Sequence, residues 1–315
     1  GDQSVLARHW QGMKRLMDHY EEIAEGWILP GGYGDYFDPG GDAIVTYTPP
    51  TLSTTLWFYR CASLMAAVAS VMEMPDVAKT YEEWSECIAV AVTNRFFDQT
   101  RGSFGSQSAD VLALAFGILP EEEDRLFAAL IEDIHLRDTH LNVGVMGVRY
   151  LFEELTKRGR GDLALALMHR NSYPSFGNLI ERGATTLWEC WGEEDHDKKQ
   201  GPRSLNHPFM GGYDNWFYNT LAGIQPDQKE PGFRHFFLKP HPIAGLDWVC
   251  ASHDSPYGRI ISYWEHRNGL FEWKVTVPEN THATATFPFT DGVKELTAGA
   301  YEFAVKDNVL SPKGE

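Results

Sequence analysis

The chain has 315 residues, of which 43% are hydrophobic, and its formal net charge is -17 at pH 7. This length and composition predict a globular protein with room for one large domain and one smaller domain. The negative charge argues against nucleic acid or an anionic membrane as a partner, because both recruit positive surfaces. The sequence has no run of about 18 apolar residues, so we expect a soluble chain that does not span a bilayer.

Residues 1–225 are predicted to be all-α. Apolar residues recur every three or four positions from about residue 3 to residue 223, which is the period of helices. Gly- and Pro-rich loops such as LPGGYGDYFDPGGD and NSYPSFGNLIERGATT separate these stretches. No strand-like alternation interrupts the helices, so the pattern indicates a helical array and not a βαβ fold.

The pattern changes after Ile224. A polar, proline-bearing stretch, PDQKEPGF, is followed by short alternating runs, RIISYWEH, LFEWKVTV and ATATFPF. This alternation predicts a small antiparallel β-sandwich over residues 226–315. Within it, Trp264, Glu265, Phe271 and Trp273 are interpreted as cross-strand packing residues and their solvent-facing partners.

The loops hold the candidate functional residues. In ATTLWECWGE the glutamate Glu189 stands between Trp188 and Trp191. A carboxylate surrounded by two indoles is partly desolvated and can hold a raised pKa, which suits a group that takes a proton from water. The alternative is a glutamate that points outward. In GGYGDYFDP the glycines bring Asp35 beside two tyrosines, although a plain turn aspartate explains this stretch equally well.

Two further residues are candidates. His207 follows Glu189 by 18 residues, so loop geometry allows the two to meet but does not require it, and a solvated or capping histidine is the alternative. Trp57 begins a helix after two prolines and is either a substrate-binding or a core residue. The stretch EEDHDKK at 193–199 places His196 among carboxylates, but a solvated loop is favoured. We therefore predict neither a metal nor a cofactor. The four cysteines form no CxxC pair and leave the cellular compartment open.

Three long runs carry a family resemblance: SFGNLIERGATTLWECWGE, SLNHPFMGGYDNWFYNTLAGI and FRHFFLKPHPIAGLDWVCASHDSPYGRIISYWEH. Together they resemble the bacterial α-L-rhamnosidases of glycoside hydrolase family 78, and the likeness extends over nearly the whole chain. The resemblance implies an (α/α)6 barrel followed by a C-terminal β-sandwich. It also implies that the substrate is a rhamnose-containing carbohydrate or glycoside, hydrolysed with inversion of configuration.

The resemblance assigns roles to the candidate residues. Glu189 falls on the ATTxWE motif, whose glutamate activates the attacking water as general base. His207 follows the SxNH motif and is expected to hydrogen-bond rhamnose or the base, and Asp35 is expected to accept hydrogen bonds from sugar hydroxyls. Trp188, and Trp57, which the resemblance does not assign and which is equally consistent with a core residue, complete the predicted substrate-binding set.

The general acid of the family is not found in the sequence. Inversion needs two carboxyl groups about 6.5–9.5 Å apart, and no D-x-x-x-R-x-E-like segment occurs between residues 1 and 315. Asp38, Glu153 and Glu181 are poor replacements. The eight or nine predicted helical stretches also fall short of the twelve helices of a full barrel. We therefore expect a barrel that is incomplete at its N-terminus, with an apolar seam that the missing part of the protein covers.

Other functions remain open from the sequence. A different (α/α)6 enzyme, such as a polysaccharide lyase or an unsaturated uronyl hydrolase, would need cationic groups around the substrate carboxylate, whereas the motif loops LWECWGEEDHD and GGYGDYFDP are acidic. A non-catalytic carbohydrate-binding fragment is the alternative outside the enzymes. The aglycone or polysaccharide that is recognised and the oligomeric state are not determined by the sequence.

Overall fold

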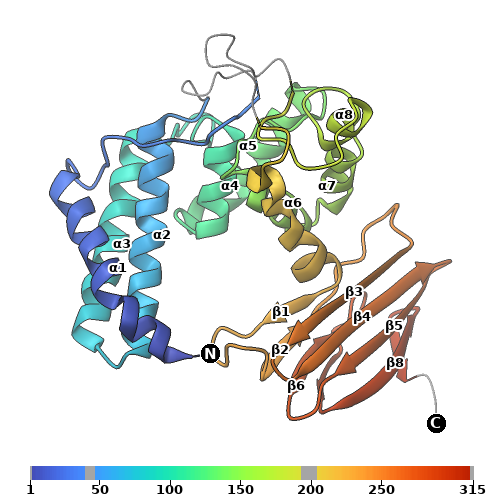
Figure 1. Cartoon of the computed structure of the whole chain (residues 1–315). Helices are drawn as coiled ribbons and strands as arrows, with labels where there is room; N and C mark the ends of the chain where they lie inside the picture. Colours follow the sequence, from blue (N-terminus) through green and yellow to red (C-terminus); the bar gives the residue numbers. More distant parts are fainter. Residues whose placement is uncertain (1, 40–46, 193–203, 313–315) are drawn as a thin grey trace. The chain divides into compact units, whose positions relative to one another are not determined.

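A computed structural model describes residues 2–39, 47–192 and 204–312 of the chain (Figure 1). The chain folds into two compact units. One contains residues 2–154 and 166–212, and the other contains residues 155–165 and those from 213 onward. Among the described residues, no helix combines the length and the apolar character that crossing a membrane would require.

The first unit is built from helices whose ends follow from the sequence. The Asp2 side chain accepts a hydrogen bond from the Ser4 amide at the first helix, and Ser106 caps the fourth helix in the same way. The second and third helices begin with a proline, whose missing N–H would have no helical partner at that position. The described helices are α1 (Gln3–Ile23), α2 (Pro50–Val71), α3 (Pro75–Phe96), α4 (Gln107–Phe116), α5 (Glu123–Leu136), α6 (Val148–Lys157), α7 (Gly161–Met168) and α8 (Phe176–Glu181).

Helices α1, α2 and α3 pack side by side (Figure 1). Their shared core includes Trp10, Met17, Phe58, Tyr81 and Ile88, each with less than a tenth of its surface exposed. The helical prediction is thus confirmed for this part of the chain. The (α/α)6 barrel, expected to be incomplete at its N-terminus, stays a prediction.

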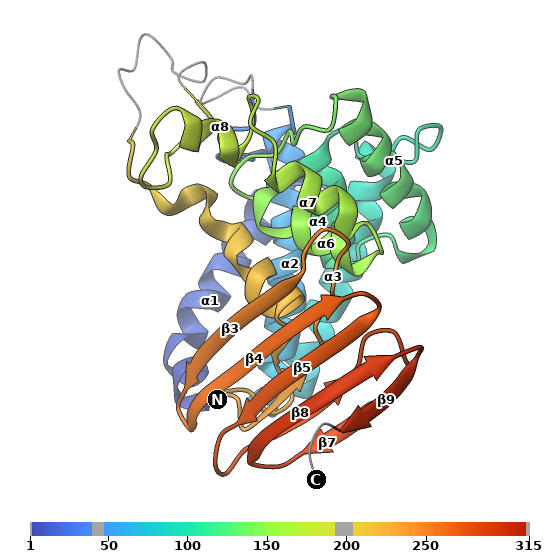
Figure 2. The same cartoon turned by 90° about the vertical axis from the view of Figure 1, so that its right-hand side faces the viewer.

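The second unit contains two β-sheets. The five-stranded sheet has the order β3-β4-β5-β8-β9 and is antiparallel throughout (Figure 2). The four-stranded sheet has the order β1-β2-β6-β7, and here β2 and β6 pair in parallel, which departs from the all-antiparallel prediction. The strands are β1 (Ile224–Pro226), β2 (His235–Leu238), β3 (Trp248–Ser255), β4 (Gly258–Arg267), β5 (Leu270–Val277), β6 (His282–Thr286), β7 (Val293–Leu296), β8 (Gly299–Lys306) and β9 (Val309–Pro312). The first strand spans the predicted domain boundary between residues 225 and 226.

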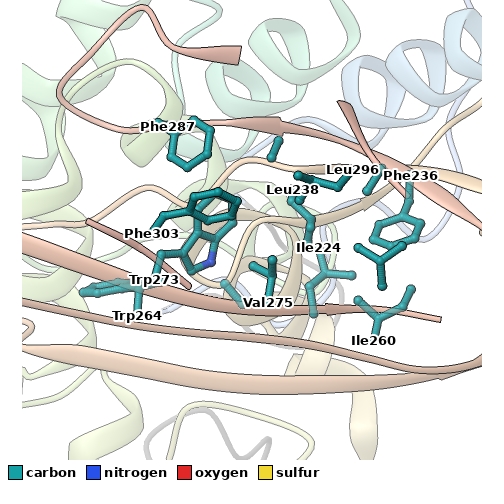
Figure 3. Close-up of a cluster of buried hydrophobic side chains, with 14 of the residues drawn as sticks. Ile224, Phe236, Leu238, Ile260, Trp264, Trp273, Val275, Phe287, Leu296 and Phe303 are labelled. Carbon is teal, nitrogen blue, oxygen red and sulfur yellow. The ribbon is translucent and has the colours of Figure 1, made fainter. Parts of the chain in front are cut away.

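The inner faces of the two sheets enclose one aromatic core (Figure 3). Trp264, Phe271 and Trp273 have no exposed surface, as their alternation with polar neighbours predicted. Phe287, which follows β6, meets Trp273 and Phe303 edge-on, with ring centroids 5.4 and 4.8 Å apart. Such perpendicular contacts add to the free energy gained by burying the rings.

Ser262 connects this core to the segment that precedes the first strand. Its hydroxyl accepts a hydrogen bond from the Trp273 indole at 3.0 Å and donates one to the Ala222 carbonyl at 2.7 Å. The Trp264 indole donates to the neighbouring Leu221 carbonyl at 2.7 Å. Both buried indole N–H groups are therefore paired, which avoids the cost of burying them without a partner.

We expect Ser262→Ala to lower the free energy of unfolding by about 1–3 kcal/mol, because it leaves the Trp273 indole and the Ala222 carbonyl without their shared partner. Urea unfolding followed by far-UV circular dichroism measures this change. The matched control is Ser252→Ala, since Ser252 is an exposed serine on the adjacent strand β3. An equal effect of the two substitutions would contradict the assignment.

Candidate active site

The carboxylate of Asp35 joins three segments that are far apart in the sequence. It has no exposed surface and accepts hydrogen bonds from the Gly144 amide at 2.6 Å, the Met146 amide at 2.7 Å and the Gly147 amide at 3.3 Å. The Ser108 hydroxyl near the start of α4 donates a fourth. Burial raises the pKa of Asp35, and these four hydrogen bonds act in the opposite direction.

Two glycines allow residues 143–147 to approach so closely. A Cβ atom on Gly144 would lie 2.3 Å from the Tyr36 carbonyl oxygen, and one on Gly147 would lie 2.6 Å from the Ser108 hydroxyl. The Val145 amide also donates to the Tyr36 carbonyl at 3.0 Å. Any larger residue at these two positions would push the loop away from Asp35.

The same 143–147 loop holds two tryptophans. The Trp191 indole donates to the Val143 carbonyl at 2.9 Å, and the Trp57 indole contacts the Met146 sulfur at 3.0 Å. Trp191 is fully buried, whereas Trp57 is half-buried and packs edge-on against Phe116, with ring centroids 5.2 Å apart. Trp57 thus lies beside the loop as part of an aromatic cluster, and its role in substrate binding stays a prediction.

The segment that carries Glu189 pairs with the segment that carries His207. The Glu189 amide donates to the Ser204 carbonyl at 3.0 Å, the Ser204 amide donates to Oε2 of Glu189 at 2.9 Å, and the His207 amide donates to the Leu187 carbonyl at 2.8 Å. The two segments run antiparallel, so the structure brings these two predicted residues onto neighbouring stretches. Residues 193–203, which include His196 and the stretch weighed as a metal site, lie outside the described part.

The tryptophans on either side of Glu189 are both buried. Trp188 has 8% of its surface exposed and Trp191 has none, whereas Glu189 is half-buried. Glu189 thus follows one buried tryptophan and precedes another in the chain, and is itself partly accessible to solvent. A carboxylate that keeps access to solvent is able to take a proton from a water molecule.

A series of aromatic ring contacts connects His207 to the glycine-rich loop that contains Tyr33, Asp35 and Tyr36. His207 Nδ1 accepts a hydrogen bond from the Phe209 amide at 3.2 Å, so a neutral imidazole carries its proton on Nε2. The rings of His207 and Phe209 are 4.0 Å apart, and Phe209 meets Tyr36 at 6.3 Å. Tyr33, next to Tyr36, is 86% exposed. The sequence analysis did not select Phe209, and its position two residues after the candidate histidine was the only available signal.

The dismissed acid candidates do not form a pair with Glu189 through any described contact. Asp38 is buried and accepts a hydrogen bond from the Tyr47 amide at 2.5 Å. Glu153 is also buried, and Glu181 is exposed at the end of α8. The general acid therefore stays unassigned among the described residues.

Asp110 is a buried carboxyl group of another kind. It lies in the first turn of α4 and accepts hydrogen bonds from the Ser103 hydroxyl and the Phe104 amide, both at 2.7 Å. Burial raises its pKa to about 7. The cleft of about 350 Å³ beside it is lined by residues from 100–110 and 129–136, and none of the loops around Asp35 or Glu189 contributes to that lining.

The comparisons with known proteins agree with this architecture. The family model of the bacterial α-L-rhamnosidase 6 hairpin glycosidase domain matches residues 1–221, and that of the bacterial α-L-rhamnosidase C-terminal domain matches residues 223–301. An α-L-rhamnosidase of Formosa agariphila is 31% identical over 329 residues, which cover 100% of this chain and 35% of that protein. The chain spans about a third of the length of the curated relatives that it matches.

Solved structures show the same likeness. The α-L-rhamnosidase from Dictyoglumus thermophilum matches with a TM-score of 0.89 and 27% identity, over 96% of this chain and 37% of that one. The Streptomyces avermitilis α-L-rhamnosidase complexed with L-rhamnose matches with a TM-score of 0.86 and 27% identity, over 97% of this chain and 31% of that one. The helical part and the C-terminal sheet part of the chain thus correspond in order to the glycosidase domain and the C-terminal domain of the two family models. The chain belongs to the bacterial α-L-rhamnosidase family.

We expect Asp35→Asn to lower the free energy of unfolding by about 3 kcal/mol, because an amide group replaces one of the two oxygens on which four donors converge. Urea unfolding of the chain measures this change, and near-UV circular dichroism reports the environment of the nearby tryptophans. Asp291→Asn, at an exposed position, is the control. A neutral effect of Asp35→Asn would show that the carboxylate does not organise the loop.

Asp110 gives a prediction of pH dependence. Its pKa of about 7 lies above the value of about 3.9 for an aspartate in an unfolded chain, so the folded protein retains a proton that the unfolded chain releases. The contribution of this carboxyl to stability therefore falls as the pH rises from about 4 to about 7. We expect Asp110→Asn to gain stability relative to the parent chain over this range, by roughly 3 kcal/mol. Unfolding curves at pH 4.5 and 7.5 test this, and a constant difference between the two proteins would contradict it.

Proposed function

We propose that the protein of which this chain forms part hydrolyses terminal α-L-rhamnosyl bonds with inversion, and that Glu189 is its general base. The observation that carries the proposal is the antiparallel pairing of the Glu189 and His207 segments. It places Glu189 and His207, both half-buried, on neighbouring segments. Membership of the α-L-rhamnosidase family supports the choice of sugar.

In this mechanism Glu189 takes a proton from water while the water oxygen bonds to the anomeric carbon of rhamnose. The glycosidic C–O bond breaks as a second carboxyl group protonates the departing oxygen, so the charges balance over the step. The hydrogen bond from the Ser204 amide to Oε2 fixes the orientation of the Glu189 carboxylate. A base that is already oriented loses less entropy in the transition state.

The neighbouring residues bind and position the sugar. His207, with its proton on Nε2, donates a hydrogen bond to a sugar hydroxyl or to the base. The exposed ring of Tyr33 and the partly exposed ring of Phe209 give flat apolar surfaces for the C–H face of the ring, and Trp188, next to Glu189 in the chain, adds apolar surface to the site. Asp35 acts as a positioning residue that holds the 143–147 loop, since its carboxylate is already occupied by four donors from the protein.

The rest of the protein completes the site in this proposal. The chain covers about a third of its relatives' length, and its helical unit is proposed to be part of an (α/α)6 barrel. The general acid is then supplied by a segment upstream of this chain. The partner that covers the exposed apolar residues of the helical unit, such as Val5 and Leu16 of α1, is that same upstream part.

Glu189→Gln tests the function directly. In the protein extended upstream in its natural reading frame, we expect release of nitrophenol from an aryl α-L-rhamnoside to fall by about 10²–10⁴-fold in kcat. Binding of rhamnose, measured by calorimetry, should be largely kept because the substitution preserves the shape of the side chain.

Glu181→Gln is the matched control, since Glu181 is an exposed glutamate of the same unit. It should leave the turnover unchanged. Absence of any turnover in the extended protein, together with rhamnose binding, would instead identify a carbohydrate-binding protein without hydrolytic activity.

A further inference from the structure

A second cleft lies within the unit that contains the sandwich. It encloses about 610 Å³, which falls in the size range of sites for small ligands. Three segments line it: residues 156–162 from the end of α6 to the start of α7, residues 239–244 after β2, and residues 286–289 from the last residue of β6 onward. All three belong to the same compact unit, and none carries a residue that the proposed hydrolysis uses.

Close contacts between the lining segments, and restrictions on their backbone, fix the shape of this cleft. A Cβ atom on Gly161 would lie only 2.2 Å from Ile243 Cγ2. Only glycine therefore lets the start of α7 approach the segment of residues 239–244 this closely. The Lys239 amide donates to the Gly223 carbonyl at 2.8 Å. Prolines precede and follow His241 and restrict the backbone there. The cleft is therefore formed before any ligand arrives, which reduces the entropy lost on binding.

The cleft is cationic, although the chain as a whole carries a net charge of -17. Lys157 and Lys239 line it together with His241. Burial, and then the charges of the two lysines, lower the pKa of His241, so the lysines supply the positive charge near pH 7. Asp162 is the only carboxylate among the lining residues, and Arg160 binds both of its oxygens, at 2.9 and 3.0 Å.

An exposed aromatic ring lies at the rim. Phe289 has 46% of its surface exposed, and its φ angle is 62°, a backbone conformation that bulky residues seldom adopt. Its ring lies 4.6 Å from that of His266 on β4. Pro242 and Pro288 add further apolar surface beside the lysines. An apolar plane next to fixed positive charges matches a sugar ring that carries an acidic substituent.

We propose that this cleft binds an anionic saccharide unit, one that bears a carboxylate or a sulfate group. The lysines contribute the attraction for the anion, and Phe289 contributes a flat face for the ring. Thr286, which also lines the cleft, offers a hydroxyl group that can pair with a sugar hydroxyl. The site takes part in binding and not in bond cleavage.

Isothermal titration calorimetry on the full chain at pH 7 and 50 mM NaCl tests this inference. The probes are trigalacturonate for the carboxylate, a 6-sulfated disaccharide for the sulfate, and maltotriose as the neutral sugar. We expect at least one anionic probe to bind at least tenfold more tightly than maltotriose and to weaken when the salt is raised to 300 mM. The comparison of the two anionic probes distinguishes a uronate site from a sulfate site.

Substitutions then locate the binding. Lys239→Gln should weaken binding of the anionic probe by about fivefold, and the double variant with Lys157→Gln should weaken it further. Lys306→Gln, at an exposed lysine of β8, is the matched control and should have no effect, and circular dichroism verifies that each variant is folded.

Equal affinity for neutral and anionic probes, no binding at all, or an equal loss in the Lys306→Gln control would overturn the inference. The titration measures association in a part of the chain remote in sequence from Glu189, and it requires no turnover. Its failure is therefore distinguishable from a failure of the proposed hydrolysis.

Discussion

A buried carboxylate organises the candidate active site. Placing a charge on Asp35, where no water reaches it, has a large desolvation cost, and hydrogen bonds to the charged form reduce this cost. The backbone amides of Gly144, Met146 and Gly147 and the Ser108 hydroxyl donate such hydrogen bonds. The loop also depends on the aspartate, because those amides would be unsatisfied donors without the carboxylate. The loop and the aspartate thus stabilise each other.

The consequences of this interaction extend to the proposed catalytic group. The loop that Asp35 holds presents the Val143 carbonyl to the Trp191 indole, and Trp191 is two residues from Glu189. One hydrogen bond therefore ties the segment of the proposed base to the loop that Asp35 organises. This chain of contacts explains how a residue with no exposed surface can matter to a reaction at the boundary with solvent.

Much of the fold follows from local patterns, and the rest depends on pairing between distant residues. The helices α2 and α3 and the buried faces of β4 and β5 are visible in the sequence because apolar residues repeat at 3.6 or 2 positions. The parallel pairing of β2 with β6 was not predicted, because strand alternation shows which face is buried but not which strand is the neighbour.

In the candidate site, too, the sequence indicates individual residues, whereas their contacts depend on the fold. The sequence selected Glu189 and His207 by their motifs, but their antiparallel pairing depends on backbone hydrogen bonds across 18 residues. The hydrogen bonds of Asp35 join it to residues more than 100 positions away, so its burial had no local signal. The cationic cleft was missed for a similar reason, since Lys157 and Lys239 lie on separate segments that the fold brings together in the lining of one cleft.

The net charge of a protein does not describe the charge of each part of its surface. A small ligand responds mainly to charged groups within about a Debye length, roughly 10 Å. A chain with a net charge of -17 can therefore still contain a positively charged cleft.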